Sequence, residues 1–433
     1  MSNSAQSTIK VSHSVSEIEQ FSAWILGMAV AVTVFFQVHV ALSGGPINVN
    51  LADPFAILAL AAVSLHVLFA QQFPAWRISQ FNLALGMISL LLLLGFVHGW
   101  LEIGITQWAL SGRLLGWFVL LGYLSAGYMI VANVGTHGLR RFSETLIATA
   151  AVVVLLQVVL RLLSQWGLDA GAQLTANFEG YAGNRNAFAI QLLVCIALLL
   201  GYSQIYARHN LGLQQLARPW AFCLLLAILL AGLVWTGSRM GILVGMLALL
   251  LAGFGRLADH RILCRGVVFG ALLWCGIWLA APNGLNSDNN PAQGNFSSVQ
   301  GKFSSESSNL ERWETLTHGV EMWRQSPVLG AGLGVFHAKS SLLMGHPQVI
   351  HSTPVWILAE FGLVGGAVVG WIFFMLGRHA IQIGKSQPAS RVLLLLLFSF
   401  VLLSLAHEIS YQRIFWLVLG ALLARPFAFS RHT

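Results

Sequence analysis

One short segment of the sequence has the residue types expected of an acid–base site. His351 is followed by Ser352, Thr353 and Pro354, and Ser or Thr before Pro favours the start of a helix. We therefore expect His351 at the N-terminal end of a helix, where the positive end of the helix dipole disfavours the imidazolium form. A histidine kept neutral in this way suits a general base, because it can accept a proton from a hydroxyl group.

Several catalytic motifs are absent from the sequence. The sequence has no Asp-x-Asp pair, the motif that would hold a metal-bound diphosphate. It also has no Walker A loop, G-x-S-x-G elbow or H-E-x-x-H helix. The four cysteines include no C-x-x-C pair, so we predict no disulfide framework and no zinc site. The glycines of residues 330–334 have the wrong spacing for a dinucleotide fingerprint. The remaining arginines, histidines and few carboxylates suit a metal-free site for a phosphorylated lipid.

The composition indicates that these residues are positioned by membrane helices. The chain has 433 residues, of which 57% are hydrophobic and 9% charged, whereas soluble domains carry about 25% charged residues. The apolar residues come in runs of about 20, as in membrane helices, and not in the alternating stretches of about 10 typical of a membrane β-barrel. The net charge of +8 then favours basic loops facing anionic lipid over a nucleic-acid site.

The predicted fold class is an all-α integral membrane protein with about twelve membrane helices and one long periplasmic loop. The apolar segments are 21–43, 54–71, 82–103, 115–133, 144–164, 187–206, 219–235, 239–256, 264–281, 354–377, 391–407 and 410–428. With the N-terminus in the cytoplasm, fourteen Lys and Arg residues fall in cytoplasmic segments, and only Arg113, Arg185, Arg239 and Arg413 in the short outer loops. The positive-inside rule therefore predicts that both termini are cytoplasmic.

An arginine on the outer face opposes this charge bias, so each one needs a reason. An anionic ligand is one reason, and a side chain that extends to lipid headgroups is the alternative. Glu360 lies within the tenth segment, where a carboxylate is usually paired, and we expect an arginine beside it. Glu102 and Arg413, near outer helix ends, are weaker candidates.

The long outer segment, residues 282–353, has three predicted parts. Residues 283–308 are rich in Asn, Ser and Gly and are typical of a flexible linker. Residues 309–325 are predicted to form an amphipathic helix, which either lies on the outer membrane surface or packs on the bundle. The glycines of 330–334 are expected to form a tight turn over the membrane surface. This organisation gives three regions, 1–281, 282–353 and 354–433, within one membrane domain.

Four motifs together resemble the O-antigen ligase family. His351-Ser352 followed by nine residues and Gly362-Leu363-Val364-Gly365 is similar to its His signature, and Ser238-Arg239-Met240-Gly241 to its S-R-x-G element. Gly183-Asn184-Arg185-Asn186 resembles its G-x-x-N element, and Arg312 followed by residues 327–336 its outer-loop pattern. The layout of spans and the single long loop also resemble this family and other multi-span transferases of lipid-linked sugars.

The resemblance implies a periplasmic glycosyltransferase in the bacterial inner membrane. Its donor would be an undecaprenyl-pyrophosphate-linked glycan, its acceptor the lipid A core oligosaccharide, and it would need no metal or other cofactor. In this scheme His351 is the general base and Arg185 and Arg239 bind the pyrophosphate. Arg312 contacts the donor glycan or phosphate, or else lies on a solvated helix face. His337 assists or binds acceptor, or is a loop histidine without a role in the reaction.

Three other functions stay open at this stage. An O-antigen polymerase would take both substrates on lipid pyrophosphate. A protein oligosaccharyltransferase would more commonly carry a further soluble domain. A transporter or flippase of lipid-linked glycan would show internal repeats and charged residues along a path through the bilayer, and no clear repeat is visible in the sequence.

Overall fold

The computed structural model describes residues 21–42, 45–165, 178–207, 213–280, 305–384 and 387–426. The predicted linker, 283–308, lies almost entirely outside the described residues. After the helix Phe21–Thr33, the elements are β1 (Gln37–Leu42), β2 (Gly45–Asn50), α2 (Asp53–Ala70), α3 (Phe81–Ile103), the π-helix η1 (Trp108–Leu115), α4 (Gly116–Val134), α5 (Thr136–Gln165), α7 (Arg185–Ala207), α8 (Leu213–Trp235), α9 (Arg239–Phe254), α10 (His260–Ala280), α12 (Ser305–Gln325), α13 (Val335–Met344), α14 (Thr353–Ile383), α15 (Pro388–Ser404) and α16 (Arg413–Leu423).

The helices have the length and composition of a multi-pass membrane protein. Among the described residues, seven helices are long and apolar enough to cross a membrane: Asp53–Ala70, Phe81–Ile103, Trp108–Val134, His137–Ser164, Arg185–Ser203, His260–Ile277 and Thr353–Ile383. Five shorter apolar helices, of 10–17 residues, overlap the other predicted segments. The helical membrane class is thus supported, whereas the count of twelve spans and the division into three regions stay predictions.

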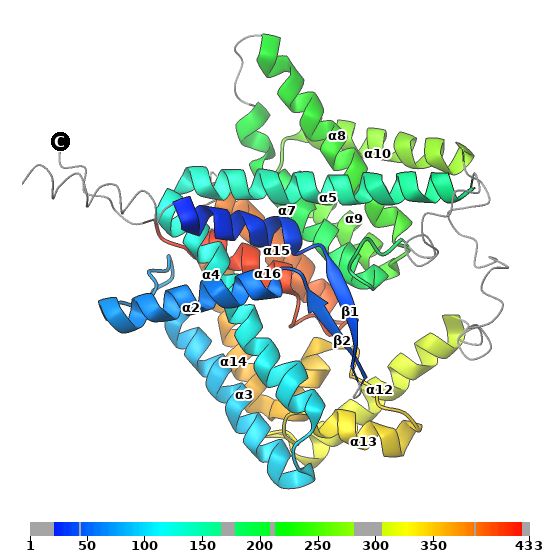
Figure 1. The fold of residues 1–433 in the computed structure, drawn as a ribbon. Coiled ribbons are helices and arrows are strands. Elements are labelled where there is room, and N and C mark those ends of the chain that lie inside the picture. Colours follow the sequence, from blue (N-terminus) through cyan, green and yellow to red (C-terminus); the bar gives the residue numbers. More distant parts are fainter. Residues whose placement is uncertain are drawn as a thin grey trace, which may run out of the picture.

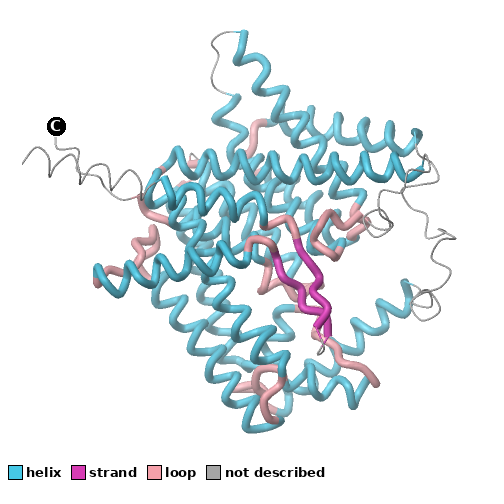
Figure 2. Tube along the Cα trace, in the orientation of Figure 1, coloured by secondary structure: helices cyan, strands magenta, loops and turns pink. Residues whose placement is uncertain are grey.

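The first apolar segment differs from its prediction, because the helix ends at Thr33 instead of near residue 43. Residues 37–42 and 45–50 form an antiparallel hairpin, the strand pair drawn in Figure 2. Val38 pairs with Val49 and Val40 with Ile47, and β-branched residues at alternate positions favour a strand over a helix. The prediction of a purely helical fold was wrong at this point, and the hairpin leads into the start of α2.

The core joins helices that are distant in sequence. α4 packs against α2, α5 and α16, while α7 packs against α5, α8 and α15 (Figure 1). α14 packs against α3, α12 and α15. A second, smaller apolar core gathers around α3, η1 and the first turns of α14, and it includes Trp117, Phe336 and Trp356. The helix starts that carry the candidate site residues are held by these contacts.

A break in α14 accommodates the glycine-rich segment. At Gly362 the backbone has φ 62° and ψ −159°, so the helix is interrupted inside its apolar stretch. Residues 327–333 run into this interruption: the amides of Ala331 and Gly332 donate to the carbonyls of Ala359 and Glu360, at 2.9 and 3.0 Å. The amides of Leu363 and Val364 donate back to Pro327 and Val328.

These hydrogen bonds satisfy backbone groups that the break would otherwise leave unpaired in an apolar setting. The segment also crosses α3, where the amide of Leu333 donates to the carbonyl of Gly95 at 2.8 Å. The expectation of a turn over the membrane surface was therefore wrong, because the glycines lie between α3 and the broken α14. The Gly-x-x-Gly part of the His signature and the outer-loop pattern therefore pack against each other through these hydrogen bonds.

Substitution of Gly332 tests the packing of residues 327–333 between α3 and α14. Gly332 has φ +99°, and a Cβ there would collide with the backbone of Gly99 on α3, so Gly332→Ala adds a clash to the strain of a left-handed residue. Gly345 also has a positive φ, +77°, but open space around it, so Gly345→Ala isolates the strain, about 1 kcal/mol. We expect thermal unfolding in detergent to show a much larger loss for Gly332→Ala than for Gly345→Ala. Equal losses would contradict the inserted position of the segment.

Candidate active site

A polar cavity of about 440 Å³ lies where the starts of α7, α14 and α16 meet the hairpin. Its lining comes from six separate parts of the chain. The lining residues are Val34, Gln37, Asn50, Ala182, Gly183, Asn184, Asn186, Ala187, Ile190, Gln191, Arg312, Val349, His351, His407, Glu408, Ile409, Tyr411, Gln412, Arg413 and Ile414. The cavity therefore brings together the predicted base His351, the predicted donor contact Arg312 and the G-x-x-N element.

His351 lies where the sequence predicts, immediately before the N-cap residue of α14, Ser352. A second histidine, His407, lines the same cavity. The hydroxyl of Thr353 fixes this arrangement, because it donates to the carbonyl of His407 at 3.0 Å and accepts from the amide of Ile409 at 3.1 Å. The start of α14 and the turn after α15 are thus held side by side.

Both imidazoles are kept neutral. Burial, and then the positive charge of Arg312, lower the pKa of His351 below its ordinary value of 6.5. Burial, Arg312 and His351 lower the pKa of His407 to about 4. Burial removes water that would solvate an imidazolium, and a nearby guanidinium repels it. At neutral pH His351 therefore presents an unprotonated ring nitrogen, which is the form that accepts a proton.

The two motifs that carry Arg185 and Arg239 meet at the rim of the cavity. The side chain of Asn184 caps α7 by accepting from the amides of Asn186 and Ala187, and Ser238 caps α9 by accepting from Gly241. Ser238 Oγ then donates to Asn186 Oδ1 at 2.8 Å, which joins the two turns. α8 and α9 are thus joined by a tight turn at residues 236–238.

Arg185 and Arg239 are therefore the first residues of two helices whose N-terminal ends lie together. Both side chains are exposed, and neither forms an ion pair within the described part of the chain. The amides of a helix N-terminus and the positive end of its dipole bind anions. Two such ends with two arginines offer a site for a doubly charged phosphate group, although neither arginine itself lines the cavity.

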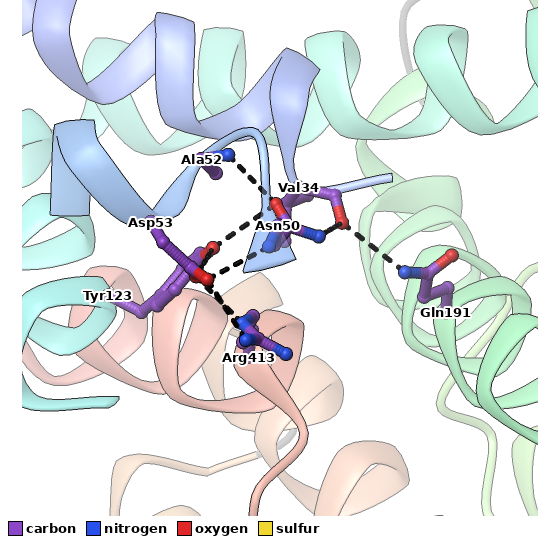
Figure 3. Close-up of polar contacts among 7 residues, drawn as sticks. All are labelled: Val34, Asn50, Ala52, Asp53, Tyr123, Gln191 and Arg413. Atoms are coloured by element: carbon purple, nitrogen blue, oxygen red, sulfur yellow. Dashed lines mark hydrogen bonds and ion pairs between the residues drawn. The ribbon is translucent and has the colours of Figure 1, made fainter. Parts of the chain in front are cut away.

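The opposite wall of the cavity is a hydrogen-bonded network, drawn in Figure 3. Arg413, the first residue of α16, makes a two-point ion pair with Asp53, with distances of 2.8 and 3.0 Å. Tyr123 of α4 donates to the same carboxylate at 2.8 Å. The backbone amide of Asn50 donates to the Asp53 carboxylate, and its side-chain amide donates to the carbonyl of Val34. The same carbonyl also accepts from Gln191 of α7. This network joins α2, α4, α7 and α16, so Arg413 has a clear structural role as well as a place in the lining.

A buried arginine lies directly behind the cavity. Arg113, on the π-helix η1, is 3% exposed and pairs with Glu408 at 3.0 Å. Its guanidinium lies over the rings of Trp108, Trp356 and Tyr411, with distances of 4.6, 4.9 and 4.6 Å to the ring centroids. Cation–π contacts and a carboxylate thus compensate for the burial of this charge.

Glu360 and His337 belong to this buried group rather than to the cavity. Glu360 is buried and accepts from Trp356 Nε1 at 2.8 Å, whereas Arg113, the arginine in its vicinity, makes its ion pair with Glu408. His337 stacks on Trp108 at 4.6 Å, and burial, then the charge of Arg113, lower its pKa. Glu102 is exposed near the end of α3. These three residues do not line the cavity.

Arg113 and Glu408 should stabilise the wall that holds His407. Arg113→Gln leaves a partly buried carboxylate without its counter-charge, and breaking a buried ion pair from one side costs about 3–5 kcal/mol. We expect a marked loss of thermal stability in detergent for Arg113→Gln, and partial recovery when Glu408→Gln is added. Unchanged unfolding of Arg113→Gln would contradict this interpretation.

The other loop predictions are partly borne out. α12 begins at Ser305, four residues before the predicted 309, and ends at Gln325 ahead of Pro327. Thr315, Gly319 and Met322 face the bundle, whereas Leu310 and Trp313 are exposed. The helix therefore packs on α14. α13, which follows the glycines, was not predicted.

The fold and the cavity define a class of protein: a multi-pass helical membrane protein in which helix starts bring arginines and histidines to one polar cavity. Within this class, the family model described as O-antigen ligase matches residues 224–370. The match confirms the family resemblance that the motifs indicate, and it includes Arg239, Arg312 and His351. No curated protein matches the chain. The family supports a glycosyltransferase-like enzyme of the ligase or polymerase type.

Proposed function

We propose that this protein transfers a glycan from undecaprenyl pyrophosphate to the lipid A core oligosaccharide on the periplasmic face of the inner membrane. The observation that carries the proposal is a neutral histidine in a polar cavity, beside which two helix N-termini that bear arginines meet. Transfer from a lipid pyrophosphate needs both features, because the leaving group is a strong anion and the acceptor is a neutral hydroxyl.

In the proposed reaction the acceptor oxygen attacks the anomeric carbon as the bond from that carbon to the phosphate oxygen breaks. The electron pair leaves with undecaprenyl pyrophosphate, whose charge Arg185, Arg239 and the ends of α7 and α9 stabilise. The hydroxyl proton passes to the ring nitrogen of His351. A single displacement of this kind inverts the anomeric centre. Arg312 contacts the donor and helps to keep His351 neutral.

The proposal assigns no metal to the reaction. Within the described ranges, no three His, Cys, Asp or Glu residues gather as a metal site, and the arginines supply the positive charge that a metal would supply in a metal-dependent transferase. Metal independence is tested by excess chelator. Buried Glu360 and half-buried His337 act here as supports of the cavity wall, because each is linked through an aromatic ring to Arg113.

The experiment is reconstitution of the purified chain with an undecaprenyl-pyrophosphate glycan, lipid A core and excess chelator. The proposal predicts glycan-extended lipid A core on a gel. Longer lipid-linked chains with unchanged lipid A core would instead identify a polymerase, which keeps the same site chemistry but changes the acceptor. A glycosylated protein acceptor would identify an oligosaccharyltransferase, and movement of the donor across vesicles without any new bond would identify a flippase.

The acid side of the pH profile should report His351. Only the unprotonated ring accepts a proton, and its pKa lies below 6.5, so we expect the rate to be level above 6.5 and to fall at lower pH. Arg312→Gln removes a neighbouring positive charge, so the pKa of His351 rises and the acid limb moves to higher pH. The position of the limb is measured, since the maximal rate also depends on donor contacts. Arg324→Gln, which changes an exposed arginine of the same helix, is the control and should leave the limb in place.

A further inference from the structure

A second polar cavity, of about 350 Å³, lies at the other end of α14. It is enclosed by residues 77–80, which lead into α3, and by the last turns of α14 between Trp371 and Gln382. The first cavity adjoins the start of α14 at His351, so the two cavities are separated by the length of the helix. The proposed glycosyl transfer makes no use of this second cavity.

The lining residues of this cavity suit an anion. Arg77, Arg378 and His379 are basic, and Ser79, Gln80 and Gln382 can donate hydrogen bonds. The described residues that line the cavity include no Asp or Glu. Arg77 is fixed in place, because its Nε donates to the carbonyl of Ala424 at 3.1 Å, while its remaining nitrogens can bind a second acceptor. Guanidinium groups recognise phosphate oxygens in this way.

Two further features favour an anionic ligand. His379 Nε2 is buried and has no hydrogen-bond partner among the described residues, and a buried polar atom without a partner is costly unless a ligand satisfies it. α3 begins at this cavity without a side-chain cap on its first turn. The positive end of its dipole therefore adds to the attraction for a phosphate group.

The surface beside the cavity suits a lipid. Phe374, which lines the cavity, is 68% exposed, and Ile381 farther along α14 is 71% exposed. Trp371 also lines it, and Trp is enriched at the depth of lipid headgroups. The charge bias of the loops predicts that this end of the helices is cytoplasmic, and the cytoplasmic leaflet is rich in anionic lipids.

We propose that this cavity binds the phosphate group of an anionic phospholipid, with the acyl chains lying along Phe374 and Ile381. The phosphate would bridge Arg77 and Arg378 and accept from His379. Residues 75–77 also pair with the end of α16, through the amide of Arg77 to Leu423 at 2.8 Å and that of Arg425 to Ala75 at 3.0 Å. A bound lipid would therefore join α3, α14 and α16 and raise the thermal stability of the whole chain.

The test is thermal unfolding of the purified full chain in detergent, titrated with phosphatidylglycerol, phosphatidylcholine or inorganic phosphate. We expect phosphatidylglycerol alone to raise the melting temperature. Arg378→Gln removes a charged hydrogen-bond donor, so it should need about tenfold more phosphatidylglycerol for the same rise. His379→Gln is a second variant that leaves both arginines in place, and it should weaken the response in the same direction. Arg261→Gln, an exposed arginine outside the cavity, is the control and should respond as the native chain does.

Three outcomes would overturn the proposal. An equal rise with phosphatidylcholine would show that the headgroup charge is not recognised. A native response from both cavity variants would show that the lipid binds elsewhere. An equal rise with inorganic phosphate would identify a site for a free anion instead of a lipid. Native mass spectrometry of the same samples should show one phosphatidylglycerol retained by the native chain and lost from Arg378→Gln.

Discussion

Replacement of His351 by alanine should lower the rate of glycan transfer by about 10²–10⁴-fold, the usual contribution of a general base. His351 is the cavity histidine at the start of α14, and burial and Arg312 keep its pKa below 6.5. The measurement is the initial rate of product formation at saturating donor, so that a change in donor affinity does not contribute. The thermal stability of the variant should stay close to that of the native chain, because Thr353 keeps its hydrogen bonds to the turn after α15.

Two matched variants sharpen this prediction. His318→Ala changes a histidine of α12 that does not line the cavity, and it should leave the rate unchanged. His407→Ala changes the neighbouring histidine, whose pKa of about 4 makes it a weak base. We expect a smaller loss for His407→Ala than for His351→Ala. The reverse order would transfer the role of base to His407.

Loss of Arg185 or Arg239 should mainly weaken binding of the donor. Each guanidinium lies at a helix N-terminus, and the bond from Ser238 to Asn186 holds the two turns together. A hydrogen bond to a charged group contributes about 1.5–3 kcal/mol, so Arg185→Gln or Arg239→Gln should each raise the KM for the donor by about tenfold or more. Lysine at either position should recover part of the loss, because it keeps the charge without the two-point geometry.

The rate at saturating donor should also fall, because negative charge grows on the leaving pyrophosphate during the reaction. Arg324→Gln is the control, since Arg324 is an exposed arginine of α12 with only a 3.8 Å contact to Glu321. If the Arg185 and Arg239 variants kept native KM and native rate, these arginines would be no more than headgroup contacts, and the proposed pyrophosphate site would be wrong.

The helix starts that carry site residues could be predicted from the sequence, because short local motifs determine them. Ser352-Thr353-Pro354 specifies the start of α14. Asn184 caps α7 through its own side chain. The position of Arg185 at a helix N-terminus is therefore fixed by its sequence neighbours. Apolar runs of about 20 residues located the helices, because a membrane helix must be apolar over that length.

Tertiary contacts decided the rest. His407 meets His351 only because Thr353 binds the turn after α15. Arg113 and Glu408 are almost 300 residues apart, and the aromatic rings around Arg113 come from three separate segments. The break at Gly362 could have been suspected from its place in the His signature, but its partner segment, 327–333, could not. The hairpin was missed because Val-rich strands and apolar helices look alike by hydropathy alone.

The central claim is that the arginines beside the cavity bind the donor while His351 inside it acts as the base. The most direct test measures donor binding and transfer on the same three proteins. The native chain, His351→Ala and Arg239→Gln are each titrated with an undecaprenyl-pyrophosphate glycan and then supplied with lipid A core. The account predicts that His351→Ala binds donor as the native chain does but forms almost no product, and that Arg239→Gln binds donor weakly. Native rates of transfer by His351→Ala would contradict the account, as would loss of donor binding by His351→Ala with native binding by Arg239→Gln.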